Sequence, residues 1–189
     1  MNPYNLRLPY WDVIGAPVFV TFRLHGSLPA NRVFQPVSVN HGRAFVAMDQ
    51  LLDHPRSGPI FLQHPEVAGM VMDSLLDADR RFRRYTLHSY VVMPNHLHLL
   101  VTPKVCAWEW LRPMKAFTGY EALRILNLSG LPFWQDESCV HLVRNAVERE
   151  RVIRYIEENP VKAGLVSVPE DFRWSSAARG ESPAAGPKP

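Results

Sequence analysis

Long apolar runs and cysteines are both scarce in this sequence. No stretch approaches the ~20 consecutive apolar residues that a membrane-spanning helix needs, and residues 1–9 lack the charged-then-apolar pattern of a secretory signal. Cys106 and Cys139 lie far apart and form no Cys-x-x-Cys motif, which excludes a disulfide framework and a four-cysteine zinc site. These absences predict a cytoplasmic protein without a membrane partner.

The chain also has only a small excess of positive over negative charge. The net charge is +3 and the pI is near 9.0, which permits a polyanionic partner but cannot by itself hold a long stretch of phosphates. With 189 residues, 47% of them apolar, the chain suffices for one well-cored domain and is too short for two of ordinary size. We expect one domain over residues 1–179 and a disordered tail over 180–189, GESPAAGPKP, which has no large apolar side chain.

Hydrophobic periodicity indicates both strands and helices. Residues 17–25, PVFVTFRLH, alternate apolar with polar side chains and predict a strand packed on one face. The runs TLHSYVVM and HLHLLVTP flank the turn-forming pair Pro94-Asn95 and predict an antiparallel hairpin. Residues 31–64 show only weak periodicity and support no assignment.

Three segments have helical spacing. They cover residues 65–81, residues 113–127 and residues 146–158, and the last is preceded by Asn145 with Glu148 three residues on, a pair that resembles a capping box. The order strand, helix, hairpin, helix, helix predicts an α+β fold, an antiparallel sheet with helices on one or both faces.

The second strand of the hairpin carries a His-x-His pair. Alternation along a strand points His96 and His98 to the same side, separated by roughly 6.5 Å of rise, while Leu97 and Leu99 point into the core. We expect both imidazoles on one exposed patch, where they could converge on a divalent metal. An isolated His-x-His is more often chance on a solvated strand face.

The helix over 146–158 offers two further candidates. Its apolar stripe leaves Tyr155 at the margin, from which the side chain could reach the sheet, although most tyrosines in such places are ordinary core-edge residues. Asn159 precedes Pro160, which disfavours continued helix, so its amide oxygen is expected at a helix end, where it could face a metal.

Four motifs in order resemble one known family: VVMPNHLHLLV, FWQDESCVHLVRN, RYIEENPVKAGLV and RWSSA. They are similar to motifs of the REP-associated tyrosine transposases, relatives of the bacterial single-tyrosine insertion-sequence transposases. The resemblance extends from about residue 65 to residue 178, and FVTFRLHGSLP matches the start of one branch. It departs at Cys139-Val140, where related sequences often have an aromatic residue and an aspartate before the histidine that is His141 here.

The resemblance implies an HUH endonuclease fold, a ferredoxin-like antiparallel sheet with flanking helices. It implies that His96, His98 and Asn159 hold Mg²⁺ or Mn²⁺ and that Tyr155 is the nucleophile. Tyr120 in KAFTGYEALRILN is the rival, because it too lies on a helix after the hairpin. A tyrosine hydroxyl has an ordinary pKa near 10 and is a poor nucleophile at neutral pH, so such an enzyme needs both the metal and the tyrosine.

The implied activity is cleavage and rejoining of single-stranded DNA near hairpins through a 5′-phosphotyrosine. Two rival functions share these residues: a catalytically silent binder of repetitive palindromic DNA hairpins, and a metal-dependent hydrolase without covalent chemistry. The binder would not need the Tyr155 hydroxyl, and no convincing carboxylate-rich ligand set supports the hydrolase. Monomer and homodimer are both compatible with the sequence.

Basic residues near the expected helices are candidates for gripping DNA phosphates, with Phe133 and Trp134 as stacking partners. The alternatives are a solvated helix terminus for the arginine cluster and ordinary burial for the two aromatic residues. The candidate DNA-binding residues are Arg80, Arg81, Arg83, Arg84, Lys115, Arg144 and Arg151, with Arg112 as a neighbour.

Overall fold

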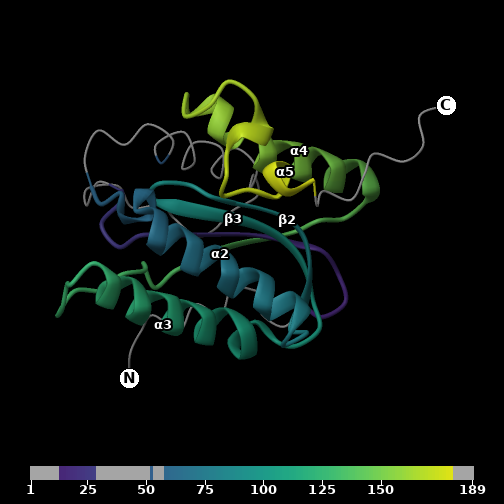
Figure 1. Cartoon of the computed structure of the whole chain (residues 1–189). Helices are drawn as coiled ribbons and strands as arrows, with labels where there is room; N and C mark the ends of the chain where they lie inside the picture. Colours follow the sequence, from purple (N-terminus) through teal and green to yellow (C-terminus); the bar gives the residue numbers. More distant parts are fainter. Residues whose placement is uncertain (1–12, 29–51, 53–57, 181–189) are drawn as a thin grey trace.

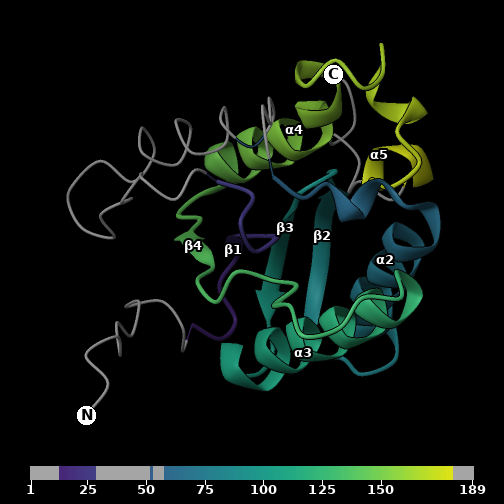
Figure 2. The same ribbon diagram turned by 90° about the vertical axis from the view of Figure 1, so that its left-hand side faces the viewer.

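The computed structural model of the chain describes residues 13–28, 52 and 58–180. Its centre is a four-stranded antiparallel sheet in the order β2-β3-β1-β4 (Figures 1 and 2). The expected tail falls outside the described residues, as does most of the segment over 31–64. Within the described part of the chain, no helix has the length and apolarity to cross a membrane.

The strands confirm the hairpin. β2 (Tyr85–Val92) and β3 (His96–Pro103) pair antiparallel around Pro94-Asn95, and the Met93 N–H donates to the His96 carbonyl across the turn. β1 (Val18–Arg23) lies between β3 and the short β4 (Cys139–Leu142). β1 therefore occupies an interior position, with a hydrogen-bonded neighbour on each side.

Helices cover both faces of the sheet, which confirms the α+β class. α2 (Pro65–Arg80) and α3 (Ala107–Ile125) pack on the face formed by alternate residues such as Val20 and Leu99. α4 (Ala146–Lys162) packs on the opposite face, around Phe19, Leu100 and Ile156 (Figure 1). The expectation that β1 packs on one face only is wrong, because Phe19 and Thr21 on the other face are also buried, and Phe19 packs against residues of α4.

α2 follows the expected range to within one residue, whereas α3 begins six residues before the expected Pro113. Its N-cap is Cys106, whose side chain and that of Glu109 form a reciprocal capping box, so Pro113 lies inside the helix. After α3 ends, Asn127 adopts a left-handed conformation and the Leu128 N–H donates to the Leu123 carbonyl.

α4 begins as expected and ends later. The Glu148 N–H donates to Asn145 Oδ1, the predicted cap, but the helix continues through Pro160 to Lys162. The proline removes one N–H donor, yet the Ala163 N–H still reaches the Asn159 carbonyl at 2.9 Å and Gly164, at φ 71°, follows the last turn. Asn159 therefore lies in the final turn of α4 and not beyond its end.

The RWSSA motif lies at the edge of the sheet that β2 forms. Trp174 and Ser175 run beside the outer edge of β2: the Val92 N–H donates to the Trp174 carbonyl, and Ser175 bridges Val91. Ser176, the first residue of α5 (Ser176–Arg179), places its hydroxyl 3.0 Å from Ser89 Oγ and 3.3 Å from Glu157 of α4. The segment thus closes the sheet edge and ties α4 to it. Two short 3-10 turns, η1 (Phe61–Gln63) and η2 (Pro169–Asp171), complete the described elements.

Candidate active site

His96 and His98 share the face of β3 that α4 covers. Both side chains are fully buried, with Nε2 atoms 3.1 Å apart and ring centroids 4.7 Å apart. The predicted common side is confirmed, as is the burial of Leu97 and Leu99 in the opposite core. The expected exposed patch is wrong, because the sequence of β3 alone does not show that α4 packs over this face.

The Nδ1 atom of each imidazole has a hydrogen-bond partner within the protein. His96 Nδ1 lies 2.7 Å from Asn95 Oδ1, and the Asn95 amide nitrogen donates to the Leu52 carbonyl. Because an amide oxygen only accepts, His96 Nδ1 carries the hydrogen and its Nε2 presents a lone pair. Without a cation, the 3.1 Å contact therefore requires His98 Nε2 to donate to His96 Nε2.

Thr21 completes this arrangement from β1. Its hydroxyl lies 2.7 Å from His98 Nδ1. When His98 Nε2 carries the hydrogen, the hydroxyl donates to Nδ1; when Nε2 is a metal ligand, Nδ1 carries the hydrogen and the hydroxyl accepts. A hydroxyl can serve both tautomers, so the pair can turn both Nε2 lone pairs toward one cation without losing a partner.

Tyr155 lies beside this pair. Its half-buried ring is 5.8 Å from the His98 ring and 6.0 Å from Phe19, measured between centroids. The Lys162 ammonium sits 5.0 Å from the centre of the tyrosine ring and also pairs with Glu158. α4 therefore brings a phenol next to the imidazole pair, as expected for a side chain at the margin of the apolar stripe.

Asn159 lies one turn after Tyr155 and is fully buried. Residues four apart on a helix share a face, so its amide belongs to the side of α4 that meets the sheet. The donor set that these elements offer is two imidazole nitrogens and one amide oxygen, a mixture that suits Mn²⁺ and tolerates Mg²⁺. Within the described residues, no group of three or more His, Cys, Asp and Glu forms an alternative metal centre.

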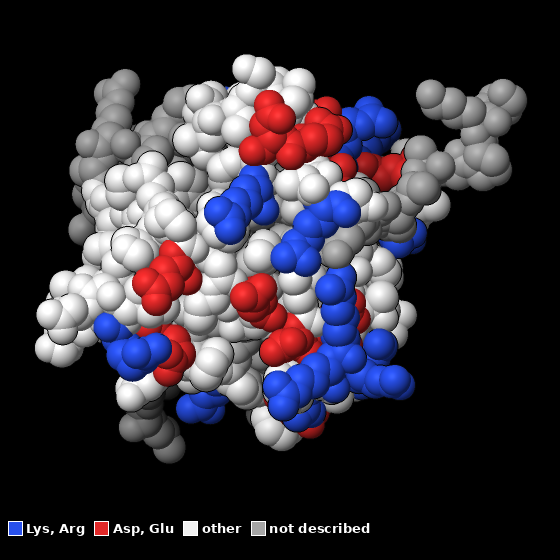
Figure 3. All heavy atoms as spheres, viewed as in Figure 1, with Lys and Arg blue, Asp and Glu red and all other residues white. Residues whose placement is uncertain are grey.

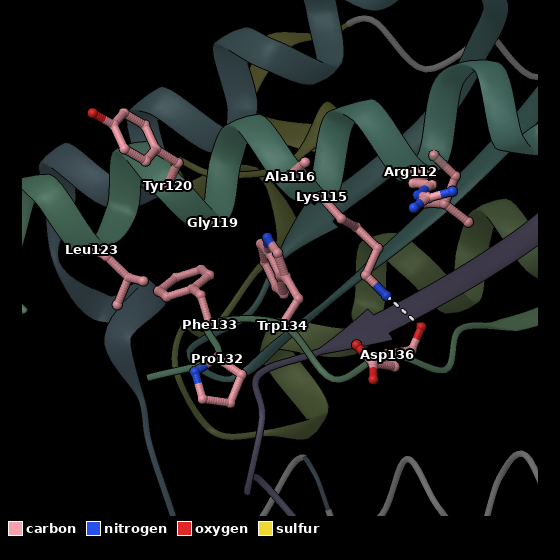
Figure 4. Close-up of a pocket in the computed structure, with 11 residues that line it drawn as sticks. Arg112, Lys115, Ala116, Gly119, Tyr120, Leu123, Pro132, Phe133, Trp134 and Asp136 are labelled. Carbon is pink, nitrogen blue, oxygen red and sulfur yellow. Dashed lines mark hydrogen bonds between the residues drawn. The ribbon is translucent and has the colours of Figure 1, made fainter. Parts of the chain in front are cut away.

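Tyr120 lies on the other side of the sheet. α3, which carries it, packs against the core opposite to His98 through Trp110, Leu111 and Met114, and the Tyr120 side chain is 68% exposed. It borders a groove between α3 and the loop before β4, together with Phe133 and Trp134 (Figure 4). The structure does not bring Tyr120 to the histidine pair.

The candidate phosphate contacts form separate groups. Arg80, Arg81, Arg83 and Arg84 are exposed where α2 ends, just before β2 begins, and Figure 3 shows cationic side chains gathered there. At ~3.3 Å per residue, the two ends of β2 lie roughly 23 Å apart, and the histidine pair is at the other end. Arg144 is exposed just before the N-cap of α4, and Arg151 is exposed in the second turn of this helix.

Lys115 differs from the arginines. Its ammonium donates to the carbonyls of Gln135 and Asp136 at 2.6 and 2.9 Å and to Ser138 Oγ at 3.2 Å. Burial, the largest effect, lowers the pKa of Lys115 to about 8. The residue holds the loop that leads into β4, so a phosphate contact would require it to give up one of these bonds. Phe133 and Trp134 are buried in the core, which agrees with the ordinary burial considered for the FW pair.

Sequence reasoning misses the residues that orient the imidazoles. The sequence assigns Asn95 only to the turn and Thr21 only to the polar side of its strand. The antiparallel register that pairs Thr21 with His98 would identify the second, but register depends on contacts between segments 77 residues apart. The unusual pair Cys139-Val140 falls on β4, where Cys139 lies opposite Thr21.

The fold and the site together define an α+β protein with a buried His-hydrophobic-His pair on an interior strand and a tyrosine on the helix above it. Comparison with known proteins then specifies the relationship. The chain is 29% identical over 111 residues to the REP-associated tyrosine transposase of Escherichia coli (strain K12), an alignment that covers 53% of this chain and 59% of the relative. No protein-family model matches the chain.

The fold comparison agrees. A solved structure described as a REP-associated tyrosine transposase bound to a REP hairpin superposes with a TM-score of 0.58 at 20% identity, covering 99% of this chain and 93% of the other. The resemblance seen in the four motifs is confirmed: the chain is similar in sequence to one REP-associated tyrosine transposase and shares the fold of the solved one.

Proposed function

We propose that this chain is a metal-dependent DNA transposase that cleaves and rejoins single-stranded DNA beside hairpins through a 5′-phosphotyrosine on Tyr155. The observation that carries the proposal is the juxtaposition of the Tyr155 ring with the paired imidazoles, 5.8 Å from His98, on a fold shared with a hairpin-bound transposase. A silent hairpin binder would have no use for a phenol beside a potential metal site.

The chemistry uses few groups. A bound Mg²⁺ or Mn²⁺, held by His96, His98 and Asn159, would polarise the scissile phosphate. Tyr155 Oη bonds to phosphorus while the P–O3′ bond breaks; its electron pair leaves on O3′, which takes up a proton, and the phenolic proton passes to solvent. In the reverse step, a 3′-hydroxyl attacks the phosphotyrosine, so the energy of the phosphodiester is kept for rejoining.

The test is formation of a covalent adduct. The protein is incubated with Mn²⁺ and a labelled oligonucleotide that contains the hairpin flanking its own gene and a single-stranded extension, then denatured and separated by electrophoresis. We expect a labelled protein–DNA band that EDTA abolishes. Tight hairpin binding without any adduct on several hairpins would overturn the proposal in favour of the binder, and multiple turnover to free ends without an adduct would favour the hydrolase.

Thr21→Val is expected to weaken Mn²⁺ binding by about 10- to 100-fold, because His98 loses the partner that accepts its Nδ1 hydrogen when Nε2 binds metal. The measurement is a titration of free Mn²⁺ by electron paramagnetic resonance. Thr118→Val is the matched control: its hydroxyl is equally buried and bonds to Trp134, but it lies on α3 across the sheet. Equal losses in both variants would contradict a specific role for Thr21.

The arginine cluster at the end of α2 is expected to contact DNA far from the cut. Replacing Arg83 and Arg84 by Gln should lower the slope of log affinity against log salt by roughly 0.9 for each duplex-stem phosphate that the protein no longer neutralises. Cleavage of a short strand that lacks the stem should be unchanged, because the cluster and the histidine pair are at opposite ends of the sheet. An unchanged salt slope would contradict a role for these arginines in DNA binding.

A further inference from the structure

Arg23 ends β1 directly opposite His96 in the antiparallel register. The same relation pairs Thr21 with His98, and there the Thr21 hydroxyl reaches the imidazole at 2.7 Å. Directly opposite residues on antiparallel strands point to the same face, with Cβ atoms about 5 Å apart. The Arg23 side chain therefore leaves the sheet on the face of the histidine pair, beside His96.

The Arg23 guanidinium interacts electrostatically with the Glu137 carboxylate and with the Lys115 ammonium. The guanidinium is half-buried, and its Nη1 donates to Ser27 Oγ over a long 3.4 Å. Among the residues that the structure describes, no carboxylate lies within ion-pair distance of it. Burial is the larger influence on the pKa of Arg23 and lowers it, while the charge of Glu137 opposes that change. A partly desolvated cation without a close anionic partner favours an anion from outside the protein.

Tyr155 and Arg23 stand on opposite sides of the pair. Tyr155 contacts His98 and Phe19, toward the start of β1, whereas Arg23 neighbours His96 at the end of β1. A phosphate placed at the two Nε2 atoms would have the phenol toward the start of β1 and the strand position of Arg23 toward its end, from which a side chain as long as arginine can extend to it. The planar, two-pronged guanidinium matches the non-bridging oxygens of a phosphodiester.

From this geometry we infer that Arg23 is a further catalytic residue, which binds the non-bridging oxygens of the scissile DNA phosphate opposite Tyr155. This inference rests on the proposed function. Arg23 would hold the phosphate in place for attack and neutralise the charge that grows on its oxygens in the transition state. The resemblance to known transposases gave Arg23 no role.

The test compares Arg23→Gln with Arg124→Gln, a control that loses the same charge from the exposed end of α3, where Arg124 pairs with Glu121. We expect Arg23→Gln to slow adduct formation by about 100-fold, as for loss of one donor to a charged transition state, and Arg23→Lys to recover part of the rate. The control should keep the wild-type rate, and the rate loss should exceed any change in DNA affinity.

Metal affinity separates this role from a structural one. Removing a cation beside the pair should leave Mn²⁺ affinity equal or tighter, whereas a residue that only positions the histidines would weaken it when removed. Weaker Mn²⁺ binding in Arg23→Gln, or an unchanged cleavage rate, would overturn the inference while leaving the proposed function intact if the wild-type protein forms the adduct.

If the proposed function itself is wrong, the role of Arg23 is tested by a different measurement. If the wild-type protein forms no adduct, Arg23 is judged by the affinity of Mn²⁺-loaded protein for single-stranded DNA alone. About a tenfold loss in Arg23→Gln with a salt slope lower by roughly 0.7, absent in Arg124→Gln, would support binding of Arg23 to a phosphate. Equal affinities in the two variants would overturn it.

Discussion

Tyr155→Phe is expected to abolish the covalent adduct, with a fall in cleavage rate of at least about 10⁴-fold, while hairpin binding persists. The substitution removes only the hydroxyl. The ring contacts with Phe19 and His98 and the position of the ring below the Lys162 ammonium do not involve the oxygen, so these contacts remain in the variant. The measurement is single-turnover adduct formation in Mn²⁺, with DNA affinity measured in parallel.

Tyr120→Phe is the matched control, because it makes the same chemical change on α3, across the sheet from the histidines. It should leave the adduct at the wild-type level. An adduct that survives in Tyr155→Phe and disappears in Tyr120→Phe would contradict the assignment, and it would require a second copy of the chain or a rearrangement to bring Tyr120 to the metal.

Local sequence patterns predict the structure correctly wherever the interactions that determine it join residues close in sequence. Alternation in β3 predicts the common face of His96 and His98, and the turn chemistry of Pro94-Asn95 predicts the hairpin. The Asn145 cap and the start of α2 at Pro65 are likewise predictable, because caps involve residues within one turn. The apolar stripe of α4 places Tyr155 at the correct margin.

Burial of the candidate site cannot be predicted in the same way. His96 and His98 are enclosed because α4 packs over β2 and β3, a contact between segments about 50 residues apart in sequence. Pro160 was expected to end the helix, but one missing donor is a small loss when Asn159 and Pro160 are both buried by tertiary contacts. The roles of Thr21 and Arg23 depend on strand register, which the isolated β1 sequence does not determine.

The resemblance of the motifs predicts some site residues that local sequence patterns do not identify, but it does not predict all of them. It selects Tyr155 over Tyr120 without any geometry, and of these two tyrosines the structure places Tyr155 beside the histidine pair. The basic residues near the helices were grouped by sequence position, which put Lys115 with the surface arginines, whereas three hydrogen bonds direct that ammonium to the loop before β4. The motifs therefore select residues that the structure brings together, whereas sequence position groups basic residues that have different surroundings.

His98→Asn is expected to weaken Mn²⁺ binding by more than about 100-fold and to eliminate the adduct at micromolar metal. Asparagine keeps a polar atom near the position of Nδ1, so Thr21 retains a partner, but it removes Nε2, the atom that faces His96. Mn²⁺ should raise the melting temperature of the wild-type protein and should not raise that of the variant, because only bound ligand stabilises the fold.

His88→Asn provides the comparison, since His88 is a half-buried histidine of the same sheet whose nitrogens contact Thr102 and Arg149 instead of another imidazole. Its substitution should alter stability without changing Mn²⁺ affinity. If His98→Asn retained wild-type Mn²⁺ affinity, the buried pair would be a structural hydrogen bond between β3 side chains. Any metal dependence of cleavage would then have to come from ions that accompany the DNA.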